Sequence, residues 1–356
     1  MRHALGLGAR GLGRTWPNPA VGCVIVKDNR IVGRGWTQPG GRPHAEVMAL
    51  LQAGAAARGG TAYVTLEPCA HHGQTPPCAG ALVAAGVVRV VSALQDPDPR
   101  VAGQGHASLR AAGLSVVEGV EAEAARQAHA GFLRRVTQGL PLVTLKLATT
   151  LDGRIATASG ESRWITGAAA RRCVHALRLG HDAVMVGSGT ARADDPDLTA
   201  RDLGATHQPV RVLIDTRAAT DPAGQLGRTA REVPVWLCHG PDAPANALAA
   251  WAAQGARLFE CDMQAGRVDV VSALRALAGA GLTRVLCEGG GQLAASLLRA
   301  DLVGEVMAFG AGLVIGEEGR AAIGTMGVTH LGEAPRFILA GTQVVGGDVV
   351  TRWLRA

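Results

Sequence analysis

Short apolar runs alternate with helical stretches along the first 140 residues. Val21 to Lys27 and Ile31 to Trp36 predict two strands joined by a turn, and a helix is expected from His44 to about Arg58. Further strands are expected at Thr61 to Glu67, Val87 to Leu94 and Leu114 to Val120, with helices near Ala79 to Ala85 and Gly105 to Ala112. This pattern predicts a five-stranded sheet with helices on its faces.

A stop signal divides the chain near residue 140. The helix expected from Glu121 to about Gln138 is followed by Gly139-Leu140-Pro141, which favours a helix end. Six short apolar runs with helical stretches between several of them then predict a mostly parallel sheet. They are Leu142 to Ala148, Asp182 to Gly187, Val210 to Asp215, Val235 to His239, Arg257 to Cys261 and Arg284 to Glu288, and Val303 to Phe309 and Thr342 to Leu354 would add edge or closing strands. We therefore expect two α/β domains, 1–140 and 141–356.

Composition agrees with two globular domains. The chain has 356 residues, of which 47% are hydrophobic and 18% charged, which is more length than one core usually serves. No window of 18 uninterrupted apolar residues and no signal-peptide core is present, so we expect a soluble cytoplasmic protein without a membrane partner. The formal charge of +6 suits either nucleic acid or a small anionic ligand. Seven scattered cysteines disfavour a disulfide framework and leave metal binding, redox chemistry or burial.

One histidine and two cysteines in the first domain have the pattern of a zinc site. His44 stands at a predicted helix start, Pro68-Cys69 follows a strand, and Pro77-Cys78 opens the next helix. Zinc with three protein ligands keeps a fourth position for water and lowers the pKa of that water. Glu46 lies two residues from His44, where its carboxylate can carry protons without binding the metal. This arrangement is typical of zinc-dependent base deaminases.

The spacing of the two cysteines departs from the usual deaminase motif. Pro-Cys-x-x-Cys is the common form, whereas Cys69 and Cys78 are nine residues apart. A simple cytidine or transfer-RNA deaminase is therefore disfavoured. His71 and His72 are rival ligands by residue type, but adjacent side chains in a loop more often face solvent or a substrate phosphate, and we leave them outside the metal shell. The structural alternative is that both cysteines are buried thiols and that His44 caps a helix.

A second set of motifs lies in the second domain. Lys146, one of only two lysines in the chain, stands in an apolar strand and is followed by the turn 151–154, which contains Asp152. A solvated lysine on an edge strand is an equally good interpretation of this position alone. Three further runs are 159–166 before a helix, 187–196 after a strand, and 288–291 between a strand and a helix. Loops at strand ends bind ligands in α/β proteins. The glycines after Glu288 allow backbone N–H groups and the next helix to approach a nucleotide phosphate.

These motifs together resemble the bifunctional riboflavin-biosynthesis deaminase-reductases over nearly the whole chain. The matching segments are 17–23, 43–47, 64–69, the insertion 71–78, 95–97, 145–147, 151–154, 159–166, 194–196 and 288–290. The resemblance implies an N-terminal three-layer cytidine-deaminase-like domain followed by a dihydrofolate-reductase-like α/β domain. It further implies hydrolytic loss of the 2-amino group of a diamino-ribosylamino-pyrimidinone 5′-phosphate, then NADPH-dependent reduction of the ribosyl group to ribityl.

The resemblance also assigns site residues. His44, Cys69 and Cys78 would hold Zn²⁺, Glu46 would move protons, and Lys146 and Asp152 would lie close to the reacting sugar. The NADPH site would be lined by Ala148, Trp164, Thr190, Asp194, Thr216, Gly290, Gly291, Gln292, Leu293, Ala294, Ala295 and Ser296. The substrate would be contacted by Ser162, Arg178, Leu198, Arg201 and Glu288. Small phosphorylated pyrimidine substrates explain the positive charge without nucleic acid, and we expect a homo-oligomer.

The main rival is a nucleic-acid or nucleoside deaminase with an accessory nucleotide-binding domain. Such an enzyme needs aromatic side chains to stack a flipped base, and the chain has one Tyr and four Phe. A purely structural zinc module is a second rival, and a fourth protein ligand would support it. A third is that only one of the two domains is active.

Overall fold

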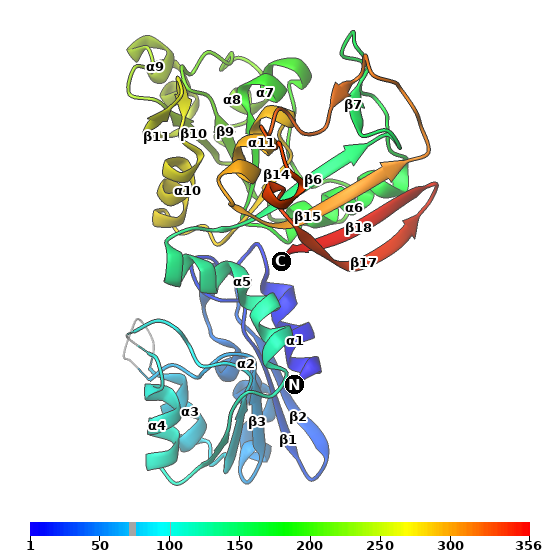
Figure 1. The fold of residues 1–356 in the computed structure, drawn as a ribbon. Helices are drawn as coiled ribbons and strands as arrows, with labels where there is room; N and C mark the ends of the chain where they lie inside the picture. The colour runs from blue at the N-terminus through cyan, green and yellow to red at the C-terminus, as the bar shows by residue number, and fades with distance from the viewer. Residues whose placement is uncertain (71–75, 100) are drawn as a thin grey trace. The chain divides into compact units, whose positions relative to one another are not determined.

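The chain forms two compact units, Met1–Leu140 and Pro141–Ala356 (Figure 1). The structure is a computed structural model that describes residues 1–70, 76–99 and 101–356. The last helix of the first unit, α5 (Ala122–Gln138), ends on Gly139 in the left-handed conformation. Pro141 follows two residues later and cannot continue a helix. In the ranges that the structure describes, no helix is both long and apolar enough to cross a lipid bilayer.

The first unit is built on a five-stranded sheet in the order β2-β1-β3-β4-β5, which confirms the predicted number of strands. Strand β1 pairs antiparallel with both β2 and β3, whereas β4 pairs parallel with both β3 and β5. The strands are β1 (Gly22–Lys27), β2 (Arg30–Trp36), β3 (Thr61–Val64), β4 (Arg89–Ser92) and β5 (Ser115–Val117). The helices before α5 are α1 (Arg2–Gly8), α2 (Ala45–Ala53), α3 (Cys78–Ala84) and α4 (Gln104–Ala111), with short 3₁₀ turns η1 (Ala9–Gly11), η2 (Pro39–Gly41) and η3 (Gly54–Ala57).

Two glycines let α2 lie directly on strand β2. A Cβ added to Gly33 would stand 2.2 Å from the carbonyl oxygen of Ala49, and one on Gly35 would stand 2.1 Å from that of Ala45. The start of α2, where His44 stands, is therefore fixed against the sheet. The helix is shorter than predicted because Gly54 takes a positive φ of 52° and ends it.

The second unit is built on a nine-stranded sheet in the order β11-β10-β9-β8-β14-β6-β15-β18-β17. Pairing is parallel from β11 to β15 and antiparallel among β15, β18 and β17, so the mostly parallel prediction is confirmed. The strands are β6 (Leu142–Thr149), β8 (Ala183–Gly187), β9 (Val210–Ile214), β10 (Val235–His239), β11 (Arg257–Glu260), β14 (Arg284–Cys287), β15 (Val303–Ala311), β17 (Phe337–Val345) and β18 (Asp348–Arg355). The helices are α6 (Ala168–Leu179), α7 (Ser188–Asp194), α8 (Gln225–Arg228), α9 (Ala245–Gln254), α10 (Val270–Gly279) and α11 (Gly291–Arg299), with the 3₁₀ turn η4 (Leu331–Glu333).

The C-terminal end of the chain is a hairpin, so the single strand predicted from Thr342 to Leu354 is wrong. Gly346 has a φ of 64° and lies between β17 and β18, where it reverses the chain. Asp348 begins β18 and is buried, and its carboxylate accepts a hydrogen bond of 2.7 Å from the N–H of Gly167, the residue before α6. The hairpin thereby caps the helix.

Two small sheets were not predicted from the sequence. One pairs β7 (Arg154–Ala156) with β16 (Arg320–Ala321), and the other pairs β12 (Met263–Gln264) with β13 (Arg267–Val268). Strands of two or three residues are too short to show a hydrophobic period. The β12–β13 turn contains Ala265 and Gly266, both with positive φ, a pair of conformations that favours a tight two-residue hairpin.

Candidate active sites

Three predicted metal ligands converge in the first unit. His44 Nδ1 and the sulfurs of Cys69 and Cys78 all lie within 4.8 Å of one another. His44 Nδ1 is 3.3 Å from Cys78 Sγ and 3.7 Å from Cys69 Sγ. Ligands placed tetrahedrally around zinc at its usual bond lengths stand about 3.3–3.8 Å apart. The three side chains therefore fit zinc and leave one tetrahedral position for another ligand.

Each ligand sits at the end of a regular element. His44 precedes α2, Cys69 lies beyond β3, and Cys78 is the first residue of α3, with its N–H 3.3 Å from Cys69 Sγ. The pKa of the Cys69 thiol is lowered to about 4, chiefly because Cys78 donates a hydrogen bond to its sulfur and His44 a second one. The same contact raises the pKa of Cys78.

Glu46 lies beside the ligands without belonging to them. It is the second residue of α2 and only 4% exposed. Burial raises the pKa of its carboxyl to about 7, and the nearby Cys69 contributes to the rise. A buried carboxyl next to an open ligand position is the arrangement that a proton carrier needs.

The buried carboxylate of Glu67 organises the backbone next to this centre. It accepts four backbone N–H hydrogen bonds, from Asp96 at 3.1 Å, Gly103 at 3.0 Å, Gly105 at 2.8 Å and His106 at 3.2 Å. Because Glu67 stands two residues before Cys69, these bonds tie a second chain segment to the loop that carries this ligand. His71 and His72, the rival ligands, lie outside the described residues.

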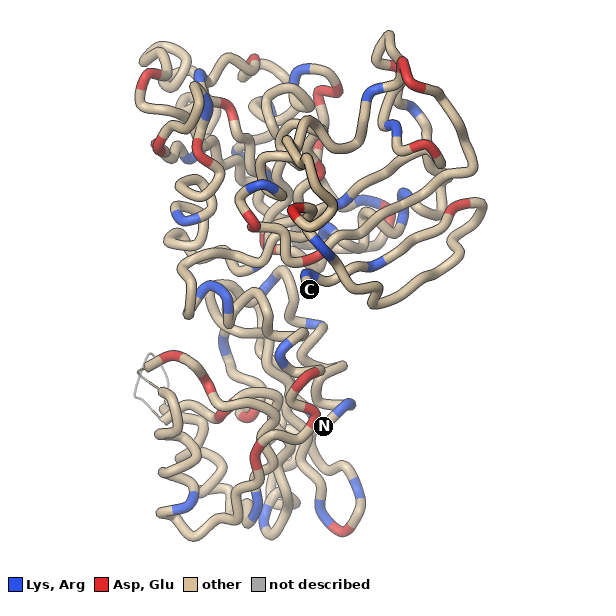
Figure 2. The backbone as a smooth tube through the Cα atoms, in the orientation of Figure 1, with Lys and Arg blue, Asp and Glu red and all other residues tan. Residues whose placement is uncertain are grey.

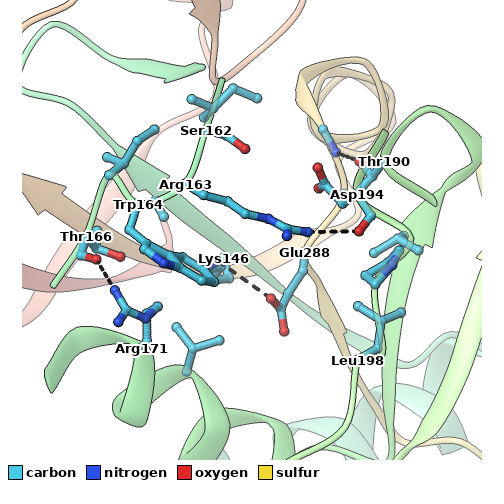
Figure 3. A pocket seen from close by; sticks show the side chains of 18 of the residues that line it. Lys146, Ser162, Arg163, Trp164, Thr166, Arg171, Thr190, Asp194, Leu198 and Glu288 are labelled. Atoms are coloured by element: carbon cyan, nitrogen blue, oxygen red, sulfur yellow. Dashed lines mark hydrogen bonds and ion pairs between the residues drawn. The ribbon is translucent and has the colours of Figure 1, made fainter. Parts of the chain in front are cut away.

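In the second unit a cavity of about 620 Å³ opens at the ends of β6 and β14. Figure 3 shows side chains from several elements pointing into it. The structure brings most of the predicted reductase residues to its wall. They are Lys146, Ala148, Ser162, Trp164, Arg178, Thr190, Asp194, Leu198, Arg201, Glu288 and Gly290.

A buried cluster of three charges lies in this cavity. Arg178 binds the Glu288 carboxylate through Nε at 2.6 Å and Nη2 at 3.0 Å, and Lys146 Nζ stands 3.6 Å from the same carboxylate. Burial alone would raise the pKa of Glu288, but Arg178 and Lys146 outweigh it and lower the pKa to about 2. Lys146 projects from β6, which has β14 and β15 as neighbours, so the edge-strand interpretation does not hold.

Other predicted residues are not brought to the cavity wall. The exposed Asp152 accepts hydrogen bonds from Thr150 Oγ1 at 2.5 Å and from the N–H of Gly316 at 2.6 Å, and these contacts lower its pKa to about 2. Asp152 therefore holds its own turn against the chain segment at Gly316. Thr216 follows β9 beyond the described wall of the cavity. The same holds for Gly291, Gln292, Leu293, Ala294, Ala295 and Ser296, which belong to α11.

The glycine turn before α11 brings the backbone close to the cavity. A Cβ on Gly289 would stand 2.7 Å from Cδ2 of Leu293, so a larger residue would require the Leu293 side chain to shift. Gly290 donates its N–H to Thr190 Oγ1 at 3.0 Å, and both glycines line the cavity. A tight glycine turn that leads into a helix N-terminus suits a nucleotide phosphate. The residues present therefore fit a dinucleotide cofactor.

Sequence reasoning missed three basic residues of the cavity wall. Arg163 donates to the carbonyl oxygen of Asp194 at 3.0 Å, and the guanidinium of Arg171 lies 4.4 Å from the ring centre of Trp164 (Figure 3). His175 is the third. A signal existed, because Arg171, His175 and Arg178 recur at intervals of four and three residues and so share one face of α6.

Fold and sites together define a two-domain enzyme that joins a zinc-dependent deaminase to a nucleotide-dependent reductase. Residues 1–94 match the family model described as the cytidine and deoxycytidylate deaminase zinc-binding region, and residues 141–351 match that of the RibD C-terminal domain. The chain belongs to the RibD family of riboflavin biosynthesis proteins.

Relatives match over nearly their full length. The riboflavin biosynthesis protein RibD of Escherichia coli is 42% identical over 98% of this chain and 96% of its own length. The solved structure of Acinetobacter baumannii RibD, form 1, covers 100% of this chain and 97% of its own, with a TM-score of 0.89 and 39% identity. A Thermotoga maritima structure, described as a diaminohydroxyphosphoribosylaminopyrimidine deaminase/5-amino-6-(5-phosphoribosylamino)uracil reductase, covers 100% of this chain and 97% of its own, with a TM-score of 0.86 and 32% identity.

Membership confirms several predictions at once. The protein is a bifunctional enzyme of riboflavin biosynthesis with a deaminase and a reductase activity. Its cofactors are zinc and NADPH, and its fold is the predicted pair of α/β domains. The match of residues 141–351 to the RibD C-terminal domain favours the bifunctional enzyme over the rival deaminase with an accessory nucleotide-binding domain.

Proposed function

We propose that the first unit deaminates 2,5-diamino-6-ribosylamino-4(3H)-pyrimidinone 5′-phosphate and that the second reduces the product, 5-amino-6-(5-phosphoribosylamino)uracil, at its ribosyl group. The observation that carries this proposal is the presence of both constellations in one chain: a three-ligand metal set beside a buried carboxyl, and a lysine–glutamate–arginine cluster in a cavity next to a glycine turn. The Thermotoga maritima relative, described as a deaminase/reductase of these two intermediates, supports the same pair of reactions.

In the proposed deamination, the residues of the first unit hold the metal and move protons. His44, Cys69 and Cys78 hold zinc, which lowers the pKa of water and so supplies a nucleophile at neutral pH. Glu46 accepts a proton from the attacking water and delivers one to the departing 2-amino group, so that water adds and ammonia leaves.

In the proposed reduction, the residues of the second unit position the sugar and balance its charge. When bound, NADPH would supply a hydride to C1′ of the ribosyl group; the bond from C1′ to the ring oxygen breaks, and a proton on that oxygen completes the ribityl chain. Lys146 stands where negative charge develops, and Glu288 fixes its position at 3.6 Å. Ser162 and Arg201 offer polar groups to the substrate from the cavity wall. Arg178 acts differently, because its guanidinium is held by Glu288 and by the carbonyl oxygen of Thr199, at 2.7 Å.

The proposed partners are small phosphorylated pyrimidines, with no nucleic acid. Only 3% of the residues are aromatic, and in Figure 2 acidic and basic positions are interspersed in both units. The expected homo-oligomer is supported by β17, an edge strand with exposed Ile338, Leu339 and Val344. A second copy would cover these side chains. The cytoplasmic location stays a prediction.

A single assay tests the proposed pair of reactions. The chain is incubated with the diamino-pyrimidinone phosphate, with and without NADPH, and the products are separated chromatographically. We expect the deaminated ribosylamino product without NADPH and the ribitylamino product with it. Ammonia release without any NADPH consumption would limit the proposal to the first unit, and an unchanged substrate would overturn it.

Glu46→Gln is expected to retain zinc and to lower deamination about 10²- to 10⁴-fold, because it removes the proton carrier and leaves every ligand in place. Metal content and ammonia release are measured on the same preparation. The matched control is Glu123→Gln, an exposed carboxyl in the first turn of α5. Loss of zinc from the Glu46 variant would contradict the role.

A further inference from the structure

Trp164 places a largely exposed indole in the wall of the reductase cavity. It lies in the loop between β7 and α6, lines the cavity, and is 68% exposed. A large side chain with so little packing around it keeps several rotamers unless another contact restricts it. The orientation of this indole therefore depends on the few side chains that touch it.

Arg171 makes two contacts with this loop (Figure 3). Its guanidinium carbon lies 4.4 Å from the centre of the Trp164 ring, which is within the range of a cation–π interaction. Its Nη1 also donates a hydrogen bond of 2.8 Å to the carbonyl oxygen of Thr166. One side chain of α6 thus holds both the indole and the backbone two residues further on.

The position of Arg171 in the fold suits it to fix this loop. It stands in the first turn of α6, where its N–H donates to the carbonyl oxygen of Gly167 at 3.1 Å. Arg163 also lies near the ring, at 5.9 Å, but its guanidinium donates to the carbonyl oxygen of Asp194 at 3.0 Å. A helix holds a side chain more precisely than a loop does, so Arg171 is the contact that sets the orientation of Trp164.

The indole that Arg171 holds keeps a second face for a ligand. The guanidinium lies over one face of the ring, and the exposed fraction of the side chain leaves the other face open. A flat aromatic face suits a planar heteroaromatic ring, because such rings stack on each other. NADPH and the deaminated pyrimidine intermediate each carry a ring of this kind.

We propose that Arg171 is a positioning residue of the reductase, which holds the Trp164 indole in the orientation that stacks on a planar ring bound in the cavity. Arg171 acts on the ligand through the indole and not by direct contact. The inference rests on the proposed reductase function and adds a residue on which the shape of the binding site depends.

The test measures binding by titration calorimetry on the full chain. NADPH and 5-amino-6-(5-phosphoribosylamino)uracil are titrated separately, so that no turnover occurs. For Arg171→Met we expect the Kd of the ligand whose ring lies on Trp164 to rise about fivefold, while the Kd of the other ligand changes less than about twofold. The matched control is Arg172→Met, the exposed next residue of α6, which lies outside the described wall of the cavity and should leave both affinities unchanged.

A double-mutant cycle separates positioning from direct contact. Trp164→Ala alone should weaken binding of the same ligand about tenfold or more, because the stacking face is lost. Arg171→Met added to Trp164→Ala should then change the Kd less than about twofold, since no indole remains to be positioned. Loss of affinity that multiplies in the double variant would show that Arg171 binds the ligand itself and would overturn the inference.

The remaining outcomes distinguish the inference from the function beneath it. Equal weakening of both ligands in Arg171→Met would overturn the inference, because it would report a general disturbance of the cavity. Unchanged binding of both ligands would overturn it as well. An unsubstituted chain that binds neither ligand would overturn the proposed reductase function itself, and this inference with it.

Discussion

Cys78→Ala is expected to remove zinc and to abolish deamination, while reduction of the deaminated intermediate stays unchanged. Cys78 supplies one of the three ligands, and the substitution removes its sulfur while keeping the backbone N–H that lies 3.3 Å from Cys69 Sγ, so two protein ligands remain. A metal held by two protein ligands is bound far more weakly, and without it no water is activated at neutral pH. Zinc content, ammonia release and NADPH oxidation are measured on one preparation.

The control for this variant is a cysteine of the same unit outside the metal set. Cys23 lies in β1 and is fully buried, and Cys23→Ala should retain zinc and deamination. Chelation of the unsubstituted chain should reproduce the Cys78 result, and adding zinc back should restore activity. A Cys78→Ala protein that deaminates at the normal rate would exclude the proposed metal chemistry.

Lys146→Met is expected to lower NADPH-dependent reduction about a hundredfold or more, with deamination unchanged. Methionine keeps most of the volume of the buried stem and removes only the charge, so the loss reports on charge stabilisation near the sugar oxygen. Because the pKa of Glu288 is about 2, its carboxylate stays ionised throughout the assay range and the ammonium of Lys146 keeps its partner. The rate of hydride transfer is followed by NADPH absorbance with the deaminated intermediate as substrate.

The chain offers one matched control for this charge. Lys27, the other lysine, ends β1 in the first unit, and Lys27→Met should leave reduction unchanged. The Lys146 variant should also bind NADPH with unchanged affinity, since the proposed role concerns the sugar. A reduction rate equal to that of the unsubstituted chain would refute the role of Lys146.

The metal centre was predictable from sequence because its ligands stand at element ends marked by local signals. Proline precedes each of the two cysteines, and His44 stands before a mostly apolar run that predicts a helix. The charged cluster of the second unit was harder to predict from sequence. Arg178 and Glu288 are 110 residues apart, and their pairing depends on α6 and β14 meeting in space. The hydrophobic period along the sequence does not indicate a contact between residues so far apart.

Other differences arise from turns and short elements. The early end of α2 depends on one positive φ at Gly54, which sequence does not distinguish from a glycine inside a helix. Asp152 has the residue type of a catalytic group, but three N–H and O–H groups nearby hold its carboxylate in a loop contact. Whether a carboxylate faces a cavity or its own turn depends on backbone conformation that residue type does not encode.

Asp348 in the C-terminal hairpin supports one wall of the reductase cavity, because its carboxylate caps α6. The helix that begins at this cap carries Arg171, His175 and Arg178 on one face. The C-terminal hairpin therefore supports the helix that carries these residues, although it contributes no side chain to the described lining. Protein engineers who append tags or linkers to this chain should treat its last ten residues as part of the enzyme and keep the added sequence beyond them.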